Sequence, residues 1–377
     1  MILADMGAEV IKIERSGAGD EMRRSPPFTR GESVPFLTLN RGKKSVTLNL
    51  KDARGRDAAR RLARRSDVVV ENFRPGTLDR LGLGPAALRA EDPRLIVCSI
   101  SGFGQTGPYR ERGGYDLIAQ AMGGLMSVTG EPGRPPAKCG FPVSDLGAGM
   151  WGALGVLLAL LARERTGQGQ HVDASLLEVP VAWSVWQAAW YFATGQVSGP
   201  LGSAHPGAAP YQAFQAQDGA WLVVGASPQH LWERLCRLLG VERLLADPRF
   251  ATNADRVLHR AELEEELAKA FGTRPAAAWL EALEAEGIPA GPVNAIDQVF
   301  ADPHILHREM VLEQEHPVAG RHRLLGIPVK LSGTPGRVRA PAPGLGQHTE
   351  EILPALGYSA EELAAFRREG VTHPKGG

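Results

Sequence analysis

The chain has 377 residues, 43% hydrophobic and 22% charged, the composition of a folded protein with room for two domains. Lys and Arg together number 42, as do Asp and Glu, so no overall field attracts nucleic acid or a membrane surface. The three cysteines, Cys98, Cys139 and Cys236, are widely spaced, which argues against a disulfide framework and favours a reducing cytoplasm. The longest apolar stretch, Met150 to Ala162, is shorter than the ~20 residues of a membrane span.

Strand and helix patterns alternate through the first third of the chain. Ala8–Ile13 has the pattern of a buried strand, and Ser45–Leu50 alternates as an exposed edge strand would. Helical spacing covers 53–65, and continuous apolar strands follow at 67–71 and 95–100. Strands that are apolar on both faces and separated by helices predict an α/β fold with a covered parallel sheet.

A long apolar helix is expected next, from about Leu146 to Arg165, with Gly167 at its end. After residue 195 the chain becomes rich in Gly, Pro, Ser and Ala, which indicates a linker. Asp218-Gly219 then lies between two alternating segments, a strong hairpin signal, and three helical stretches follow at 230–239, 260–271 and 276–286.

These patterns predict a large domain, a smaller α+β domain and a return to the first. The expected divisions are residues 1–195 for the first part of the large domain, 196–210 for the linker, 211–315 for the small domain and 316–377 for the C-terminal return.

One motif is misleading. Gly102-Phe-Gly104-Gln-Thr-Gly107 matches the GxGxxG pattern and follows a strand. A dinucleotide fingerprint needs its third glycine inside a helix that faces the pyrophosphate, whereas Pro108 follows here at once. We therefore expect a strand-to-loop turn, which can still hold a ligand at the carboxyl end of a parallel strand.

Ser144 and Asp145 stand where the apolar helix begins. Either residue is a common helix N-cap, which is the simplest interpretation. The same position also suits a reactive carboxylate, because backbone N–H groups at a helix start favour negative charge and can stabilise an oxyanion. Gly147 and Gly149 carry no side chains, so a bulky ligand could approach the backbone there.

Polar and basic residues follow the strand at 67–71. Asn72-Phe-Arg74-Pro-Gly is either a simple turn or, with Arg80, a shelf for phosphate groups. Basic pairs at 23–24 and 43–44, with Arg41, are either solvated surface charge or part of an anion pocket.

Two kinds of chemistry find little support. His304 and His307 could share a helix face, but no third ligand stands near them in sequence, so we expect no metal site. No GxSxG motif is present to anchor a Ser-His-Asp triad.

The chain resembles the class III CoA-transferase family, the group of formyl-CoA transferase and carnitine-CoA transferase, to which the alpha-methylacyl-CoA racemases are similar. The matching segments occur in family order and cover nearly the whole chain: ADMGAEVIKIE (4–14), NRGKKSVTLNLK (40–51), DVVVENFRPGTLDRLGL (67–83), SGFGQTGPY (101–109), YDLIAQAMGGLMSVTG (115–130), SDLGAGMWGALGVLLALLARERTGQGQ (144–170) and GIPAGPV (287–293).

This resemblance implies a CoA transferase that moves coenzyme A from an acyl-CoA to a free carboxylic acid, with Asp145 as the catalytic residue. Coenzyme A is then a substrate, and neither a metal nor a redox cofactor is needed. The implied fold is a Rossmann-like large domain plus a small α+β domain in an interlocked homodimer. The implied CoA contacts are Arg15, Leu48, Lys51, Asn72, Phe73, Arg80, Arg112 and Tyr115.

The chain departs from the family pattern in three places. A strand and an Ala-Gly-Pro turn that usually precede residues 4–14 are absent. Either the start codon was placed late, which we favour, or this member is shortened. Gly113 occupies a position that is basic in formyl-CoA transferase, where Arg112 could substitute. The loop Gly202–Gly207 resembles the mobile loop that covers the active site in the transferases, but it holds fewer glycines.

Two alternatives stay open: an alpha-methylacyl-CoA racemase and a CoA-binding protein without catalysis. In the racemases a histidine stands at the position of Tyr115, opposite the aspartate. A phenol, with a pKa of ~10, is mostly protonated at neutral pH and does not replace an imidazole as a base. We therefore expect transfer, although the sequence does not identify the acids.

Overall fold

The structure is a computed structural model that describes residues 1–373; the predicted C-terminal return extends past this range at 374–377. The chain divides into two compact units. A large unit consists of Met1–Gly123, Gly140–Trp183 and the chain from Asp302, and a small unit consists of Gly124–Cys139 and Ser184–Ala301. The sequence-based divisions at 195, 210 and 315 thus differ from these bounds, and 124–139 joins the small unit.

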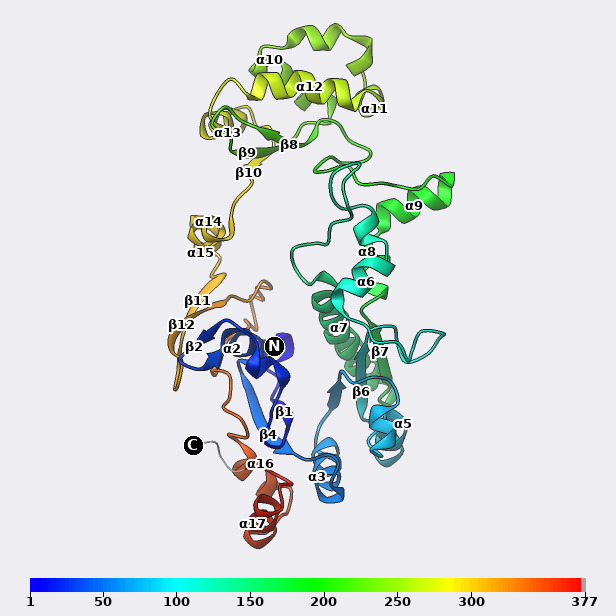
Figure 1. Cartoon of the computed structure of the whole chain (residues 1–377), viewed down its shortest axis with the longest axis vertical. Helices are drawn as coiled ribbons and strands as arrows, with labels where there is room; N and C mark the ends of the chain where they lie inside the picture. Colours follow the sequence, from blue (N-terminus) through cyan, green and yellow to red (C-terminus); the bar gives the residue numbers. More distant parts are fainter. Residues whose placement is uncertain (374–377) are drawn as a thin grey trace. The chain divides into compact units, whose positions relative to one another are not determined.

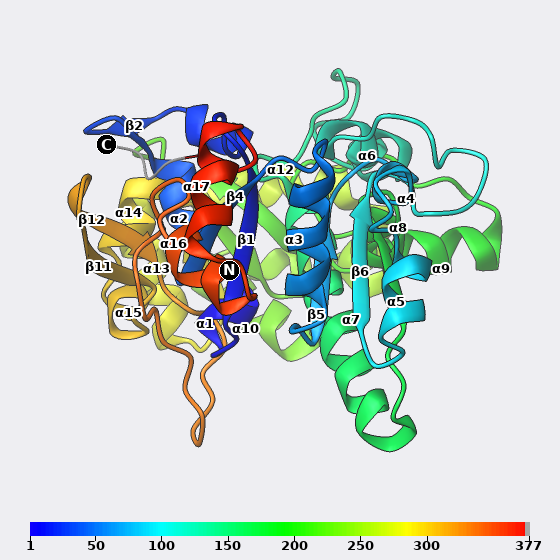
Figure 2. The ribbon, with the colours of Figure 1, turned by 90° about the horizontal axis from the view of Figure 1, so that it is seen from below.

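The large unit contains five parallel strands in two sheets (Figures 1 and 2). β1 (Val10–Arg15) pairs with β4 (Lys43–Leu48), and β6 (Ile96–Ser101) lies between β5 (Val68–Glu71) and β7 (His171–Ser175). The α/β class and the parallel pairing are confirmed. The prediction of one sheet is wrong, because β4 and β5 are not hydrogen-bonded neighbours.

One hydrophobic core joins both sheets of the large unit. It contains Val46 of β4 and Val97 of β6, together with side chains from α3 (Ala53–Ala63), α16 (Thr349–Ala355) and α17 (Ala360–Arg368). Residues 45–48 are therefore buried, and the expectation of an exposed edge strand is wrong. The alternating polar residues of β4 are bonded inside this core, since Ser45 donates to Glu14 and the Thr47 amide donates to Thr349. β1, by contrast, is half-buried along most of its length.

The long apolar helix is α7 (Val143–Thr166), which packs on β6 and β7. Two glycines permit a close approach, because a Cβ at Gly152 would lie 2.9 Å from Ile100 and one at Gly155 would lie 2.6 Å from Val172. Gly167 follows the helix in the left-handed conformation, as predicted. Among the described residues, α7 is the one helix long and apolar enough to cross a membrane, and 28% of its most apolar window is buried.

The small unit has the predicted α+β organisation. β8 (Tyr211–Gln215) and β9 (Trp221–Gly225) form the expected hairpin, and β10 (Ala290–Pro292) adds a third antiparallel strand. The predicted helices are α10 (Gln229–Leu239), α12 (Arg260–Phe271) and α13 (Ala276–Ala285), which pack around buried aromatic rings.

The remaining elements are short. They are α1 (Ile2–Asp5), η1 (Glu21–Arg24), β2 (Phe28–Thr29), β3 (Glu32–Ser33), α2 (Val34–Asn40), α4 (Thr77–Arg80), α5 (Pro85–Glu91), α6 (Asp116–Met122), η2 (Leu125–Ser127), α8 (Glu178–Trp183), α9 (Val185–Thr194), η3 (Glu242–Ala246), η4 (Pro248–Phe250), α11 (Asn253–Leu258), α14 (Ile296–Ala301), α15 (Pro303–His307), β11 (Val311–His316) and β12 (Gly320–Leu325).

Candidate active site

Asp145 lies in the first turn of α7, and its side chain is exposed. The helix begins at Val143 after Pro142, so neither Ser144 nor Asp145 is the N-cap, and the simplest sequence interpretation is wrong. A proline offers no capping side chain, and the free amides of the first turn need other acceptors. Asp116 of α6 supplies one: its Oδ1 accepts from the Ser144 amide at 2.8 Å and from the Asp145 amide at 3.4 Å.

The first-turn amides of α7 are thus already occupied. The Val143 amide donates to Phe141 and the Leu146 amide donates to Pro142, which leaves none of the four initial donors for an oxyanion. This corrects the expectation that these amides stabilise a developing oxyanion. Gly147 is also not open to a ligand, because a Cβ there would lie 2.4 Å from Val179 of α8. Gly149 does face open space, as expected.

The carboxyl group of Asp145 has a perturbed acidity. Partial burial at the helix start, and after it the like charge of Asp116, raise the pKa of Asp145 above its usual value. A carboxylate that is harder to keep charged is a stronger base, and it remains accessible here. Sequence reasoning missed Asp116, although it directly follows the predicted contact Tyr115 and Pro142 signals a helix start without a cap of its own.

The loop from Gly102 to Tyr115 leaves the carboxyl end of β6 and returns to α6. Its two ends touch, since a Cβ at Gly102 would lie 2.7 Å from the Cα of Gly114. Turns follow Gly107 and no helix begins before Asp116, so the expected strand-to-loop turn is confirmed. Arg112 stacks 3.9 Å from the centre of the Tyr109 ring, and the side chain of Tyr115 is 78% exposed immediately before Asp116.

A second group of predicted contacts follows β5. Asn72 donates to the carbonyl oxygen of Ile100 on β6 at 2.8 Å, which fixes it at the carboxyl end of that sheet. Phe73 and Arg80 are both exposed, and Arg80 donates to Thr77 within α4. Arg74, beside Phe73, lies 3.4 Å from a Cβ built at Gly113, so this group adjoins the loop that carries Arg112 and Tyr115.

The third group lies at the end of the other sheet. Arg15 and Leu48 are the last residues of β1 and β4 and are partners in the parallel register. Leu48 is buried, so it can contribute to a CoA site only through its backbone or as an apolar lining residue. Arg15 and Lys51 are exposed. The predicted residues therefore gather at carboxyl strand ends in two sheets, the edge at which open α/β folds bind ligands.

Ion pairing separates these cations from the other basic residues. Within residues 1–373, Arg15, Lys51, Arg80 and Arg112 have no carboxylate partner, so they are free to meet phosphate oxygens. The basic pairs at 23–24 and 43–44 and Arg41 are different, because the Arg41 guanidinium is buried against Asp5, and Arg23 is bound to Glu14. The idea that they form an anion pocket is wrong for these two arginines.

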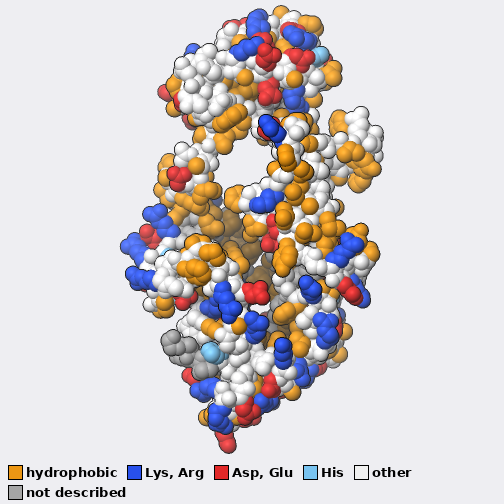
Figure 3. Space-filling model, in the orientation of Figure 1, with side chains coloured by type: hydrophobic (Ala, Val, Ile, Leu, Met, Phe, Trp, Pro, Cys, Tyr) orange, Lys and Arg blue, Asp and Glu red, His pale blue; other side chains and the backbone are white. Residues whose placement is uncertain are grey.

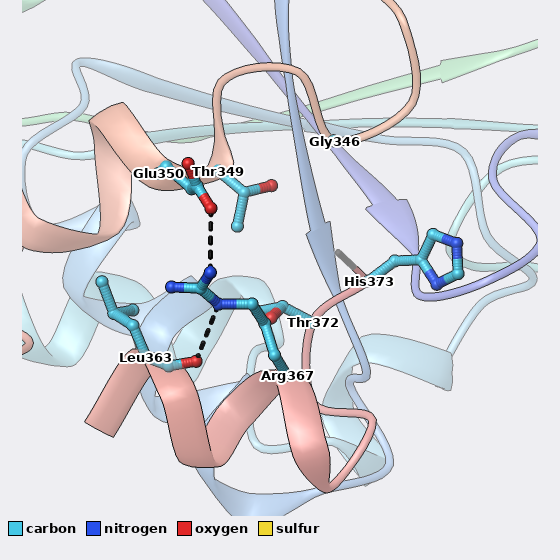
Figure 4. A pocket seen from close by; sticks show the side chains of 7 residues that line it. All are labelled: Gly346, Thr349, Glu350, Leu363, Arg367, Thr372 and His373. Atoms are coloured by element: carbon cyan, nitrogen blue, oxygen red, sulfur yellow. Dashed lines mark hydrogen bonds and ion pairs between the residues drawn. The ribbon is translucent and has the colours of Figure 1, made fainter. Parts of the chain in front are cut away.

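Other features of the large unit do not compete with this site. The small hollow in Figure 4 lies between α16 and α17, and its lining includes the 3.0 Å ion pair of Arg367 with Glu350. Across the face in Figure 3, basic and acidic side chains are interspersed, so an anion needs local partners. No group of three potential metal ligands occurs in the described part of the chain.

His171, the histidine that follows α7 in sequence, does not lie beside Asp145 in the large unit. His171 begins β7 and contacts Ser99 at 2.9 Å, whereas α7 starts at the carboxyl end of this sheet and ends near Gly167 at the other. The two residues therefore lie at opposite ends of the sheet. His205 belongs to the loop Gly202–Gly207 of the small unit, where Arg260 donates to its carbonyl oxygen.

An α/β protein with an accessible carboxylate and unpaired cations at strand ends fits an acyl-group or CoA-transferring enzyme. The family model "CoA-transferase family III" matches residues 1–349. The succinyl-CoA:glutarate CoA-transferase of Mus musculus is 42% identical over 354 residues, 94% of this chain and 81% of that protein. The succinyl-CoA–D-citramalate CoA-transferase of Chloroflexus aurantiacus is 39% identical, covering 98% of this chain and 92% of its own.

A solved structure agrees. The CAIB/BAIF family protein from Brucella suis superposes with a TM-score of 0.82 and 38% identity over 94% of this chain and 93% of that one. The chain therefore belongs to CoA-transferase family III and is a CoA-transferase enzyme. The resemblance seen in the sequence is confirmed, and the alternative of a CoA-binding protein without catalysis is not supported.

Proposed function

We propose that this enzyme moves coenzyme A from an acyl-CoA to a free acid through a covalent intermediate on Asp145. The observation that carries the proposal is an accessible carboxylate of raised pKa at the start of α7, next to α6 and the loop that carries the unpaired cation Arg112. A carboxylate is a weak nucleophile in water, but one that is positioned and partly desolvated can open a thioester.

The chemistry proceeds in two matched halves. The Asp145 carboxylate attacks the thioester carbonyl, and collapse of the tetrahedral adduct breaks the C–S bond to give a mixed anhydride and CoA thiolate. The thiolate then attacks the aspartyl carbonyl, which releases the donor acid and leaves an aspartyl-CoA thioester. The acceptor carboxylate repeats these steps in reverse order, so that the new acyl-CoA leaves and Asp145 is regenerated. No metal or redox cofactor enters this balance.

The phosphates of coenzyme A are assigned to the unpaired cations. Arg15, Lys51, Arg80 and Arg112 offer charged donors, and Phe73 and Tyr115 offer exposed rings. Charged hydrogen bonds to phosphate are short and strong, so a few of them can bind an anion without a global field.

The acids proposed are dicarboxylates, with succinyl-CoA as donor. This rests on the names of the mouse and Chloroflexus relatives, which transfer from succinyl-CoA to glutarate or to D-citramalate. A panel of succinate, glutarate, malate, citramalate, oxalate, formate and carnitine with succinyl-CoA or acetyl-CoA tests it. Transfer confined to monocarboxylates would contradict it.

The covalent step has a direct test. During turnover with acyl-CoA, hydroxylamine should convert the activated Asp145 carboxyl into a hydroxamate, which peptide mass mapping locates. Asp145→Ala should show no modification and no transfer, whereas Asp116, the neighbouring carboxylate, should remain unmodified in the wild type. Full transfer by Asp145→Ala would reject the mechanism.

Racemisation is the second candidate, and the site disfavours it. Tyr115 stands where a racemase has a base, and His171 lies at the far end of the sheet from α7. Incubation of a 2-methylacyl-CoA in deuterated water should leave the α-carbon unlabelled. Rapid uptake of deuterium with inversion, and no transfer to any acid, would favour the racemase.

We further propose a cytoplasmic, interlocked homodimer whose large domain is Rossmann-like. Support comes from α7, which leaves an apolar stripe uncovered along one face. A continuous apolar stripe on a protein surface usually marks an interface. A second copy of the chain could bury this stripe, so no membrane is needed to cover it. Its residues are Leu146, Met150, Leu154, Leu157, Leu158 and Leu161, each at least 43% exposed.

A further inference from the structure

Asp116 is placed to do more than cap a helix. It starts α6, and its Oδ1 accepts from the Ser144 and Asp145 amides, while its Oδ2 accepts from Gln120 at 2.7 Å. Gln120 is fully buried, and its hydrogen bond anchors the second oxygen of this carboxylate. No cation of the described chain pairs with Asp116, so its negative charge is balanced only by amide dipoles.

We propose that Asp116 is a positioning residue for the nucleophile Asp145: it fixes the first turn of α7 and holds a second negative charge against the attacking carboxylate. This rests on the proposed function of Asp145. When Asp145 attacks the thioester, its charge moves onto the substrate oxygen and, after acylation, is lost. Repulsion between the two carboxylates is therefore relieved during attack, which lowers the barrier relative to the free enzyme.

The other titratable groups around α7 do not supply this charge. Those on the elements packed against the helix are engaged elsewhere: Glu178 of α8 accepts from Ser175, Asp173 of β7 accepts from the Gln105 amide, His171 of β7 contacts Ser99, Cys98 of β6 contacts the Gly152 carbonyl, and Asp5 of α1 pairs with Arg41. On α7 itself Arg163 pairs with Asp67 near the opposite end. Among the described residues, Asp116 is the charged neighbour that raises the pKa of Asp145, in addition to the larger effect of partial burial.

Three substitutions separate charge from capping. Asp116→Asn keeps an oxygen acceptor for the Ser144 amide but removes the charge, Asp116→Glu keeps the charge on a longer side chain, and Asp116→Ala removes both. If Asp116 were only a cap, Asp116→Asn would behave as wild type and Asp116→Ala would lose stability. If the charge matters, Asp116→Asn loses activity while remaining folded.

The experiment is the pH dependence of CoA transfer, with circular dichroism and size measurement as controls for folding. For Asp116→Asn we expect kcat to fall roughly fivefold, because a weaker base is a weaker nucleophile. The acidic limb of the pH profile should move to lower pH, with little change in KM for the acyl-CoA. Asp116→Glu, which keeps the charge, should return the acidic limb of the pH profile to its wild-type position. A wild-type kcat and limb in Asp116→Asn would overturn the proposal.

Two further measurements cover the case in which Asp116→Asn does not fold and the case in which Asp145 is not the nucleophile. If Asp116→Asn does not fold, the wild-type kcat/KM for the acyl-CoA, which reports groups of the free enzyme, is followed down to about pH 3; an inflection at or below the ordinary aspartate value of about 3.9 would overturn the proposal. Asp145→Ala is assayed in parallel. Transfer by that variant rejects the nucleophile itself and the positioning role with it, whereas an inactive Asp145→Ala beside an unaltered Asp116→Asn rejects the positioning role alone.

Discussion

At the residue scale, the cations of the site differ from other exposed basic residues because they form no ion pair with a carboxylate. Arg64 is exposed like Arg80, but it is paired with Glu91, while Arg80 has only a hydrogen bond to Thr77. An unpaired cation at a strand end keeps its full charge for a ligand, whereas a paired one must first give up its partner. The sequence alone makes these two arginines look alike.

This difference predicts how the two arginines affect CoA binding. Arg80→Ala or Lys51→Ala should weaken CoA binding by about 1–3 kcal/mol, the loss of one charged hydrogen bond. That corresponds to a rise of roughly 5- to 150-fold in Kd, measured by isothermal titration calorimetry. Arg64→Ala is the matched control and should leave Kd unchanged. Unchanged affinity in both Arg80→Ala and Lys51→Ala would show that CoA does not bind at these strand ends.

At the element scale, local sequence patterns predict the positions of helices and strands better than they predict the burial of those elements. α12 occupies the predicted range, because a helix with one apolar face shows its own periodicity. β4 was predicted as an exposed edge since Ser45 and Thr47 alternate with apolar residues, yet both are buried and bonded to groups far along the chain. No local pattern contains such partners.

The start of α7 shows the same limit. The sequence places Asp145 at the helix start, but it does not contain the acceptor of its amide, since Asp116 lies 29 positions earlier on another helix. Recognition of Asp145 thus depended on the family resemblance, and its electrostatic neighbour required the fold. Oxyanion stabilisation by α7 was a reasonable expectation that fails for the same reason, because tertiary contacts had already used the donors.

The loop Gly202–Gly207 is held in place within the small unit. Arg260, at the start of α12, donates to the carbonyl oxygens of His205 and Pro206, and the His205 amide donates to Tyr211. Its role as a lid stays a prediction, and any opening must break these bonds. Arg260→Ala should therefore raise deuterium uptake in peptides covering 202–207 by roughly tenfold, the effect of losing about 1–2 kcal/mol of local stability.

The control for this loop lies on the same helix. Lys269 of α12 is exposed and paired with Glu265, so Lys269→Ala should leave the exchange of 202–207 unchanged. If Arg260→Ala changes nothing either, the bonds of Arg260 do not hold the loop. If exchange rises while kcat stays constant, loop closure does not limit turnover.

At the scale of the whole molecule, α7 poses the main physical problem. One face packs on β6 and β7 through Gly152 and Gly155, while another face presents leucines to solvent along its length. A lipid bilayer and a protein partner could each cover such a stripe, and composition alone does not separate them. The close packing of one face on a parallel sheet favours a protein partner. If α7 crossed a membrane, the sheet packed on it would also have to enter the lipid, where the unpaired backbone groups of a sheet edge are unfavourable.

The homodimer proposal predicts that the folded protein is never monomeric. Wild type should sediment as a dimer even at nanomolar concentration, because threaded chains do not separate without unfolding, and its melting temperature should rise with protein concentration. Leu154→Glu with Leu158→Glu places two charges on the stripe and should give unfolded or aggregated chain. Leu258→Glu is the matched control, since Leu258 on α11 is 78% exposed but belongs to no such stripe, and it should remain dimeric. A folded, active wild-type monomer would refute the interlocked assembly, and binding of the wild type to lipid vesicles that is lost in the double variant would assign the stripe to a membrane.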